Sequence, residues 1–142
     1  MKVNIKKLEL AAVIPTYAKP GDAGMDLVAI RHELDELGNH IYHTGLAIEI
    51  PTGYVGLLFP RSSNRKTNAY MTNHVGVIDS GYRGEIMVTF KNRDVDMHAT
   101  PYKEGDKIAQ LMIMPYPIIE LVEVDELSET ERGTGGHGST GN

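Results

Sequence analysis

The apolar residues of this chain occur in short runs, each about as long as a β-strand and each followed by residues that favour turns. The runs span residues 3–10, 27–30, 46–50, 54–59, 86–90, 108–114 and 118–124. The turn-forming residues between them include Pro20-Gly21, Pro51-Thr52-Gly53 and Glu104-Gly105-Asp106. Many short strands with regular turns are typical of a β-sandwich, a jelly roll or a barrel. The sequence therefore predicts an all-β fold, and its 142 residues suit one compact domain.

One segment does not follow this pattern. Ile30, Leu34 and Leu37 lie at helical spacing, and Gly38 is suited to end a helix. A helical turn and an irregular strand followed by a loop are equally open for this segment.

The charge of the chain is negative, with 14 Lys plus Arg against 19 Asp plus Glu and a net charge of -5. A protein that coats nucleic acid or an anionic membrane presents an excess of basic residues, so we expect neither partner. The chain has no cysteine, which excludes disulfides, thiolate metal ligands and cysteine nucleophiles. No apolar run approaches the roughly 20 residues of a membrane helix, and the start of the chain lacks an apolar signal segment. We therefore expect a soluble, cytoplasmic protein.

A first candidate site follows the apolar run 54–59. There Pro60 leads into Arg61, Ser62 and Ser63. Hydroxyls and exposed N–H groups at a turn or helix start can hold an oxyanion, and arginine adds a two-pronged donor. A polar turn with a surface arginine explains the same residues, so this segment alone does not decide between the two.

A second candidate site is a predicted hairpin. An apolar strand through Val77 and Ile78 stops at Asp79, and Gly81, Tyr82 and a second strand follow. A carboxylate after apolar neighbours is expected to be partly desolvated, which suits a general base. Tyr82 beside it could pack against a sugar or a base. An ordinary hairpin with aspartate at its turn is an equally good reading.

The end of the chain changes character. Residues from Ser128 onward are polar, then charged, then glycine-rich, with five glycines among the last ten residues. On composition alone this is a disordered terminus, because it has few apolar side chains whose burial could offset the entropy lost on ordering. The same glycines, together with Arg132 and two hydroxyls, also suit the wrapping of a phosphate. The segment is not a Walker loop, since no Gly-Lys-Ser/Thr follows it.

Two further segments carry weaker signals. Residues 21–27 form a glycine turn with two carboxylates, and residues 105–111 read as a turn that enters a buried strand, where Gln110 needs a hydrogen-bond partner. The histidines have no metal-ligand spacing with carboxylates, and His40 and His43 would face opposite sides of a strand. We therefore expect no metal site built by the protein itself.

Taken together and in this order, five segments resemble the five motifs of the homotrimeric dUTP pyrophosphatases. The matching segments run from Ala23 to Gly141 and are 23–27, 60–63, 73–85, 105–110 and 132–141. The resemblance implies a jelly-roll-like sandwich or distorted barrel over residues 1–127 and a mobile C-terminal arm over residues 128–142. It implies a homotrimer whose three active sites are each assembled from all three chains. The implied reaction is hydrolysis of dUTP to dUMP and pyrophosphate, which keeps uracil out of DNA and supplies dUMP for dTMP synthesis.

The resemblance also implies which residues act on the triphosphate of the substrate. Asp79 would orient the water that attacks the α-phosphorus, with no covalent intermediate. The phosphates would be held by Arg61, Ser62, Ser63 and Gln110. Asp26 would support them through Arg61 or a Mg²⁺-bound water. The Mg²⁺ cofactor would be carried by the triphosphate and not by the protein directly.

For the nucleoside, the resemblance implies that main-chain groups of the hairpin read the uracil edge, around Asn73, Val77, Ile78 and Met87. Tyr82 would pack under the deoxyribose and leave no room for a 2′-hydroxyl. The arm would close over the nucleotide, with Arg132 on the γ-phosphate, His137 stacked on the uracil, and Ser139 and Thr140 near the phosphates.

The chain departs from the family pattern at a few positions. Ser63 stands where many members have glycine, Gly81 where aspartate is frequent, and Lys107 where arginine is frequent. His137 stands at a position that is usually phenylalanine, and a protonated imidazole there would add a charge near the phosphates. None of these departures removes the expected base, Asp79.

Two other functions remain open. A dCTP deaminase, or a bifunctional deaminase and pyrophosphatase, shares this kind of fold and needs a carboxylate near the base, for which Glu85 is the nearby candidate. A non-catalytic nucleotide-sensing protein on the same scaffold is the other alternative. Asp79 argues against it, because a protein that only binds an anion gains nothing from another carboxylate beside it.

Overall fold

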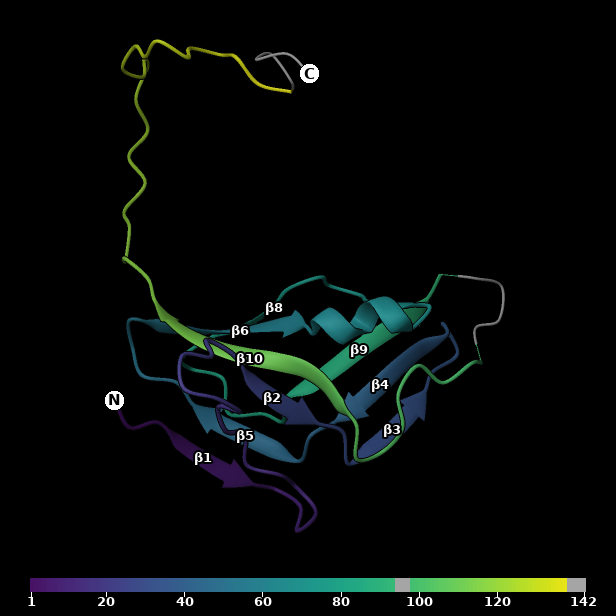
Figure 1. Ribbon diagram of the computed structural model, residues 1–142. Helices are drawn as coiled ribbons and strands as arrows, with labels where there is room; N and C mark the ends of the chain where they lie inside the picture. Colours follow the sequence, from purple (N-terminus) through teal and green to yellow (C-terminus); the bar gives the residue numbers. More distant parts are fainter. Residues whose placement is uncertain (94–97, 138–142) are drawn as a thin grey trace.

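The chain folds into short antiparallel strands, as Figure 1 shows. The computed structural model describes residues 1–93 and 98–137. The strands are β1 (Asn4–Lys7), β2 (Met25–Val28), β3 (Arg31–Leu34), β4 (Asn39–His43), β5 (Leu46–Glu49), β6 (Tyr54–Pro60), β7 (Ala69–Met71), β8 (Gly76–Ile78), β9 (Met87–Asn92) and β10 (Lys107–Pro115). A 3₁₀ helix, η1 (Ser62–Lys66), follows β6 and is the sole helix in the described part of the chain. The prediction of an all-β fold is confirmed.

The strands form two four-stranded sheets and one two-stranded sheet. The larger sheets have the orders β2-β10-β6-β8 and β3-β4-β9-β7, and β1 pairs with β5. All of the pairings are antiparallel. The arrangement is the jelly-roll-like sandwich that the sequence predicts.

The segment that the sequence left open is a strand and a turn. Residues 31–34 pair with residues 40–43 of β4, with Arg31 opposite His43. In the turn between them, an oxygen of the Asp35 carboxylate accepts hydrogen bonds from the N–H groups of Leu37 and Asn39. Gly38 has a φ of 77°, which glycine adopts without strain. Cross-strand pairing therefore overrides the helical spacing of the apolar residues.

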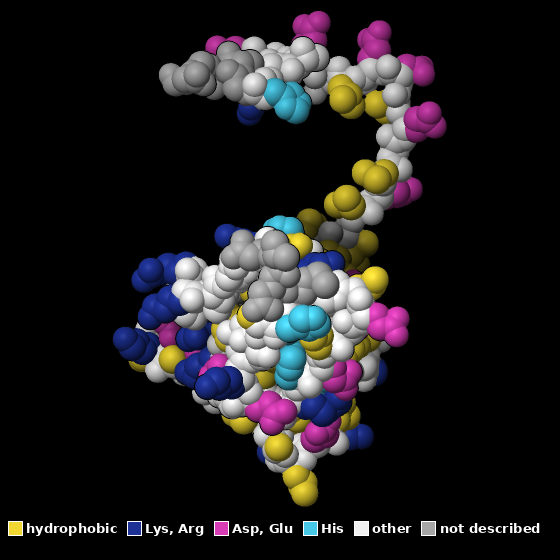
Figure 2. Space-filling view, turned by 90° about the vertical axis from the view of Figure 1, so that its right-hand side faces the viewer, with side chains coloured by type: hydrophobic (Ala, Val, Ile, Leu, Met, Phe, Trp, Pro, Cys, Tyr) yellow, Lys and Arg dark blue, Asp and Glu magenta, His cyan; other side chains and the backbone are white. Residues whose placement is uncertain are grey.

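The expected strand at residues 118–124 is wrong. From Tyr116 onward the chain runs away from the strands, and Figure 2 shows apolar and acidic side chains projecting from it along its length. The apolar side chains here are largely exposed, Leu121 to 89%. A strand needs a partner for its N–H and C=O groups, and the described part of the chain supplies none for this segment. The predicted division between residues 127 and 128 remains a prediction.

The core lies between the two larger sheets and takes side chains from both. Fully buried residues include Leu27, Ile108 and Leu111 on one sheet and Tyr42, Val88 and Phe90 on the other. The rings of Tyr42, Phe90 and Tyr102 contact one another with centroids 5.1–5.9 Å apart. No helix in the described residues is long and apolar enough to span a membrane.

The Tyr42 hydroxyl holds the loop before β10 against the core. It donates to the carbonyl of Tyr102 at 2.9 Å and accepts from the N–H of the same residue at 3.0 Å. Burial raises the pKa of Tyr42 to about 12. One buried hydroxyl therefore satisfies two backbone groups that are far from it in sequence.

We predict that Tyr42→Phe lowers the free energy of unfolding by about 1–3 kcal/mol, because two buried backbone groups lose their partner. Urea unfolding measures the change. Tyr17→Phe is the matched control: Tyr17 is 55% exposed, so its hydroxyl should matter by less than about 0.5 kcal/mol. Equal effects of the two substitutions would contradict the prediction.

Candidate active site

Most of the predicted site residues line two hollows on the chain, and Ser63 and the described residues of the arm line neither. The first, which we call the hairpin hollow, is lined by Leu58, Asn73, Gly76, Val77, Ile78, Asp79, Tyr82, Glu85, Ile86, Met87 and Thr89. The second, which we call the basic hollow, is lined by Ala18, Lys19, Asp22, Ala23, Gly24, Asp26, Arg61, Ser62, Gln110 and Met112. The two share no residue.

Strand alternation sets the direction of the side chains around Asp79. In β8, Val77 is 64% exposed and Ile78 is buried, so the next residue, Asp79, points outward and is exposed. The expectation that Asp79 is partly desolvated is therefore wrong for the single chain. Its carboxylate lies at the rim of the hairpin hollow, accessible to water and to a ligand. The turn closes when the N–H of Tyr82 donates to the carbonyl of Asp79 at 3.0 Å.

The Tyr82 ring rests on its own turn. Its hydroxyl donates to the carbonyl of Glu85 at 2.9 Å. A Cβ on Gly84 would lie 2.5 Å from the Tyr82 Cζ atom, so glycine is required for the ring to lie where it does. The ring stays partly exposed and forms one wall of the hairpin hollow.

The hairpin hollow also presents unpaired main chain. Among the described residues, β8 is an edge strand that pairs with β6 alone. On β9, the described ladder with β7 reaches only to the pair Met71 and Phe90, and one further bond joins Thr72 to Thr89. Met87 therefore lies beyond the ladder on the side of this hollow. Backbone donors and acceptors are thus available where the sequence predicts contacts to a base edge.

The basic hollow exists because three strands lie side by side. In the ladder β2-β10-β6, Gln110 lies opposite Asp26 on one side and opposite Phe59 on the other. Arg61 follows directly after β6, and η1 begins with Ser62. Three segments that are far apart in the sequence therefore meet at one strand end.

Asp26 orients Arg61. Its carboxylate accepts from the Arg61 Nε at 2.7 Å and from a second guanidinium nitrogen at 3.3 Å, and the Lys107 Nζ lies 3.0 Å away. Burial by itself raises the pKa of Asp26, but the hydrogen bonds and charges of Lys107 and Arg61 outweigh it and hold the pKa below its usual range. The Arg61 guanidinium also donates to Ser63 Oγ at 3.1 Å.

Gln110 has the partner that the sequence requires, since its amide nitrogen donates to the carbonyl of Pro60 at 3.1 Å. Gly24 allows this close packing, because a Cβ there would lie 2.5 Å from the Gln110 Oε1 atom. The amide is therefore held at the wall of the basic hollow.

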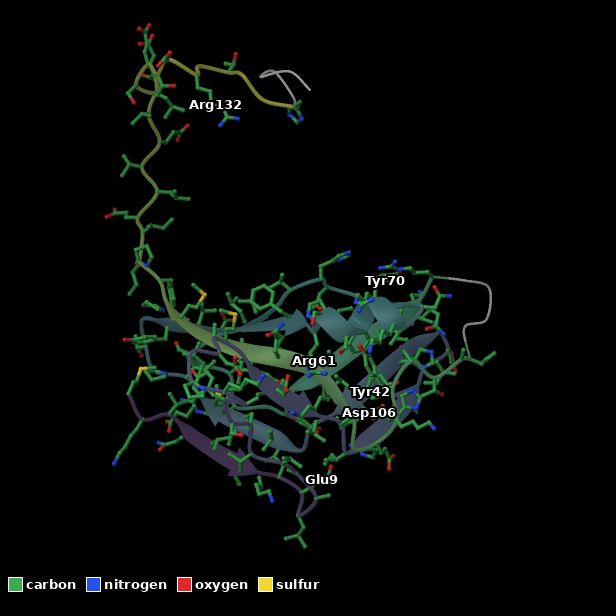
Figure 3. The ribbon with its side chains drawn as sticks, viewed as in Figure 1. Glu9, Tyr42, Arg61, Tyr70, Asp106 and Arg132 are labelled. Atoms are coloured by element: carbon green, nitrogen blue, oxygen red, sulfur yellow. The ribbon has the colours of Figure 1, made fainter. Side chains whose placement is uncertain are left out.

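The arm does not join either hollow in the single chain. Figure 3 shows Arg132 on the extended segment, well clear of Arg61 and of the strands. Its Nε donates to the carbonyl of Gly135 at 3.0 Å, and His137 is exposed. Ser139 and Thr140 lie outside the described residues.

The described residues contain no group of three or more His, Asp and Glu arranged to hold a metal ion. His40 contacts His32, with ring nitrogens 3.0 Å apart, whereas His43 contacts Glu85. Sequence reasoning missed Lys19 in the basic hollow and the ion pair between Lys107 and Asp26. The sequence offered one signal for this ion pair, because Lys107 stands where the family frequently has arginine.

Comparisons with known proteins identify the family of this chain. A family model described as dUTPase matches residues 11–141. The deoxyuridine 5'-triphosphate nucleotidohydrolase of Nautilia profundicola is 44% identical over 99% of this chain and 99% of its own length. That of Nocardia farcinica is 41% identical over 98% of this chain and 85% of its own length. The chain belongs to the dUTPase family.

Solved structures show the same fold. The Staphylococcus bacteriophage 80alpha dUTPase with dUPNHPP has a TM-score of 0.84 and 30% identity, covering 99% of both chains. A variant of the phage phi11 dUTPase, described with a structural Mg(II) ion, has a TM-score of 0.73 and 29% identity over 89% of this chain and 98% of its own. The jelly-roll-like fold of this chain is therefore that of known dUTPases.

We predict that Asp26→Asn destabilises the protein at pH 7 and that the difference from the unsubstituted protein shrinks in acid. The folded-state pKa of Asp26 is depressed, so its ion pairs stabilise the fold above the unfolded-state pKa of about 3.9 and stop doing so as the pH falls through the folded-state value. Urea unfolding between about pH 7 and pH 3 measures the difference. If the difference in the free energy of unfolding stays the same across this range, the substitution destabilises the fold through the packing of the amide and not through the lost charge.

Proposed function

We propose that this protein hydrolyses dUTP to dUMP and pyrophosphate, in the cytoplasm, lowering dUTP and supplying dUMP for dTMP synthesis. One observation carries the proposal: the hairpin hollow combines an exposed carboxylate, Asp79, with the Tyr82 ring and with unpaired main chain of β8. Membership of the dUTPase family supports the same reaction.

Asp79 acts as the base. Its carboxylate accepts a hydrogen bond from a water and orients it toward the α-phosphorus. The water oxygen bonds to phosphorus, the bond to the α,β-bridging oxygen breaks, and pyrophosphate leaves with that oxygen. The water proton passes to Asp79 and then to solvent. Its position in the lining of the hairpin hollow supports this role, because the hollow leaves room for a water beside the carboxylate.

The basic hollow holds the phosphates. Arg61 offers guanidinium donors that Asp26 keeps in one orientation, and a preoriented donor loses little entropy when a phosphate binds. Ser62, Ser63 and Gln110 add hydroxyl, amide and main-chain donors. These groups neutralise charge that grows on the leaving pyrophosphate.

The hairpin hollow holds the nucleoside. Main-chain groups of Asn73, Val77, Ile78 and Met87 read the uracil edge, and the Tyr82 ring packs under the deoxyribose and excludes a 2′-hydroxyl. Support comes from the edge position of β8 and from the fixed ring of Tyr82.

Mg²⁺ is the cofactor, carried by the triphosphate. The described residues fit this arrangement, because the Asp26 carboxylate in the basic hollow is engaged by Arg61 and Lys107 and is not a free ligand. A bound Mg²⁺ neutralises phosphate charge and fixes the triphosphate conformation. Asp26 would support it through a Mg²⁺-bound water.

The active form is a homotrimer in which each site draws on three chains. A dUTP molecule needs both hollows, yet on one chain they share no residue. The apolar side chains of the extended segment, such as Ile118 and Leu121, are exposed in the single chain and require a second copy to bury them. The arm then covers the nucleotide, with Arg132 on the γ-phosphate, His137 on the uracil, and Ser139 and Thr140 near the phosphates.

The alternatives are less well supported. Deamination of dCTP needs a free carboxylate at the base, but both oxygens of the Glu85 carboxylate accept hydrogen bonds, one from His43 of β4 and one from Gly45 between β4 and β5. A purely nucleotide-sensing protein would gain nothing from the exposed carboxylate of Asp79 beside a triphosphate.

The test of the function is turnover of dUTP, dTTP, dCTP and UTP by the unsubstituted protein and by Asp79→Asn. We expect pyrophosphate from dUTP alone, and Asp79→Asn should reduce turnover about 1000-fold or more while binding a non-hydrolysable dUTP analogue within about threefold. Glu36→Gln, an exposed carboxylate in the turn after β3, is the control and should have no effect. Ammonia from dCTP, or unchanged turnover in Asp79→Asn, would overturn the proposal.

Shared sites can be tested by mixing two inactive variants. Asp79→Asn and Arg61→Ala trimers should each be inactive. Random mixed trimers should recover activity at about one site in four, because such a site takes its hairpin from one variant and its basic hollow from the other. Absence of recovery in trimers shown to be mixed would mean that both hollows of a site come from the same chain.

A further inference from the structure

Glu85 has no role in the reaction described above, although it lies in the wall of the hairpin hollow. It follows the turn that carries Tyr82 and stands two residues before the start of β9. Both of its carboxylate oxygens are engaged by the corner between β4 and β5. Oε1 accepts from the N–H of Gly45 at 2.8 Å, and Oε2 lies 2.9 Å from the Nδ1 of His43.

The charge of Glu85 is compensated on the β4 side. Burial by itself raises the pKa of Glu85, but the hydrogen bonds from His43 and Gly45 and the charge of Arg31 outweigh it and keep the carboxyl ionised. A guanidinium nitrogen of Arg31 also lies 3.0 Å from the His43 Nδ1, and a Glu33 oxygen lies 3.4 Å from the His43 Nε2. Only 19% of the Glu85 side chain is exposed, so these contacts are poorly screened by water.

The same corner holds the backbone next to Glu85. Thr44 Oγ1 donates to the carbonyl of Ile86 at 2.7 Å, and the N–H of Ile86 donates to the carbonyl of Leu46 at 2.8 Å. The exit of the hairpin is therefore attached to the β4–β5 corner through both side chain and backbone.

The position of the Tyr82 side chain depends on this attachment. Its hydroxyl bonds to the carbonyl of Glu85, and its ring lies over Gly84. The position of the ring thus depends on where residue 85 is held. A shift of the Glu85 carbonyl moves the wall of the hairpin hollow that faces the sugar.

A second attachment on the other flank of the hairpin is weaker. Arg83 donates to the carbonyl of Ser80 at 2.7 Å and contacts a Glu49 oxygen at 3.3 Å. Both side chains of this ion pair are about half exposed, and exposed pairs contribute little to stability. Glu49 therefore provides a matched carboxylate whose removal should leave the hollow unchanged.

We propose that Glu85 is a positioning residue that sets the selectivity of the site for deoxyribose over ribose. Its carboxylate holds the exit of the hairpin on the β4–β5 corner, and the Glu85 carbonyl in turn holds the Tyr82 ring where a 2′-hydroxyl would clash. The inference rests on the proposed function, because it assumes that the hairpin hollow binds the nucleoside.

The test compares kcat and KM for dUTP and UTP in Glu85→Ala, Glu85→Gln and Glu49→Ala. We expect Glu85→Ala to lower the dUTP-to-UTP ratio of kcat/KM about tenfold. For dUTP, the rise in KM should be larger than the fall in kcat. Glu85→Gln should restore the ratio, because its amide oxygen can accept from Gly45 and its amide NH₂ group can donate to the His43 ring. Glu49→Ala should match the unsubstituted protein.

Selectivity separates positioning from a purely structural role, since lower stability alone reduces the amount of folded protein and leaves the ratio unchanged. An unchanged ratio in folded Glu85→Ala, or an equal drop in Glu49→Ala, would overturn the inference. Should Glu85→Ala fail to fold, Glu85→Asp carries the same expectation, because its shorter side chain cannot reach both donors. Failure of the unsubstituted protein to hydrolyse dUTP would instead count against the proposed function.

Discussion

The pairing of β10 with both β2 and β6 is the interaction on which the rest of the structure depends. β10 is the longest strand and contributes the fully buried Ile108 and Leu111 to the core. The same pairing places Gln110 beside Asp26 and brings both next to the end of β6, where Arg61 follows. One ladder thus stabilises the sandwich and builds the basic hollow. A shift of its register by one residue would bury Gln110 and turn core side chains outward.

The chain forms the parts of a nucleotide site without joining them. The hairpin hollow and the basic hollow have no lining residue in common on one copy, and Arg132 lies well clear of Arg61. The apolar side chains along residues 118–127 remain exposed for the same reason, since the core of a single copy is already closed by its two sheets. The proposed homotrimer would account for the separate hollows and for the exposed segment together.

Many residues of the candidate site could be picked out from the sequence because their chemistry is local. Arg61 with Ser62 and Ser63, and Asp79 with Tyr82, are short groups whose residue types point to phosphate binding and to base catalysis. Two expectations were wrong and one segment was left open, because the pairing and alternation of strands decided them. Residues 118–124 have the composition of a strand but no strand partner among the described residues, and Asp79 follows apolar residues but is turned outward by strand alternation. The segment after Ile30 has helical spacing, yet pairing with β4 makes it a strand.

The sequence by itself determined that the chain is all-β and which segments carry the chemistry, because turn formation and the character of a short motif depend on neighbouring residues. Only the tertiary structure decided that Arg61 is oriented by Asp26, 35 residues away, and that Glu85 is held by His43, 42 residues away. It also decided that the two hollows remain separate on one copy. Such contacts depend on strand order and register, which are settled by packing of the whole core and not by any short stretch of sequence.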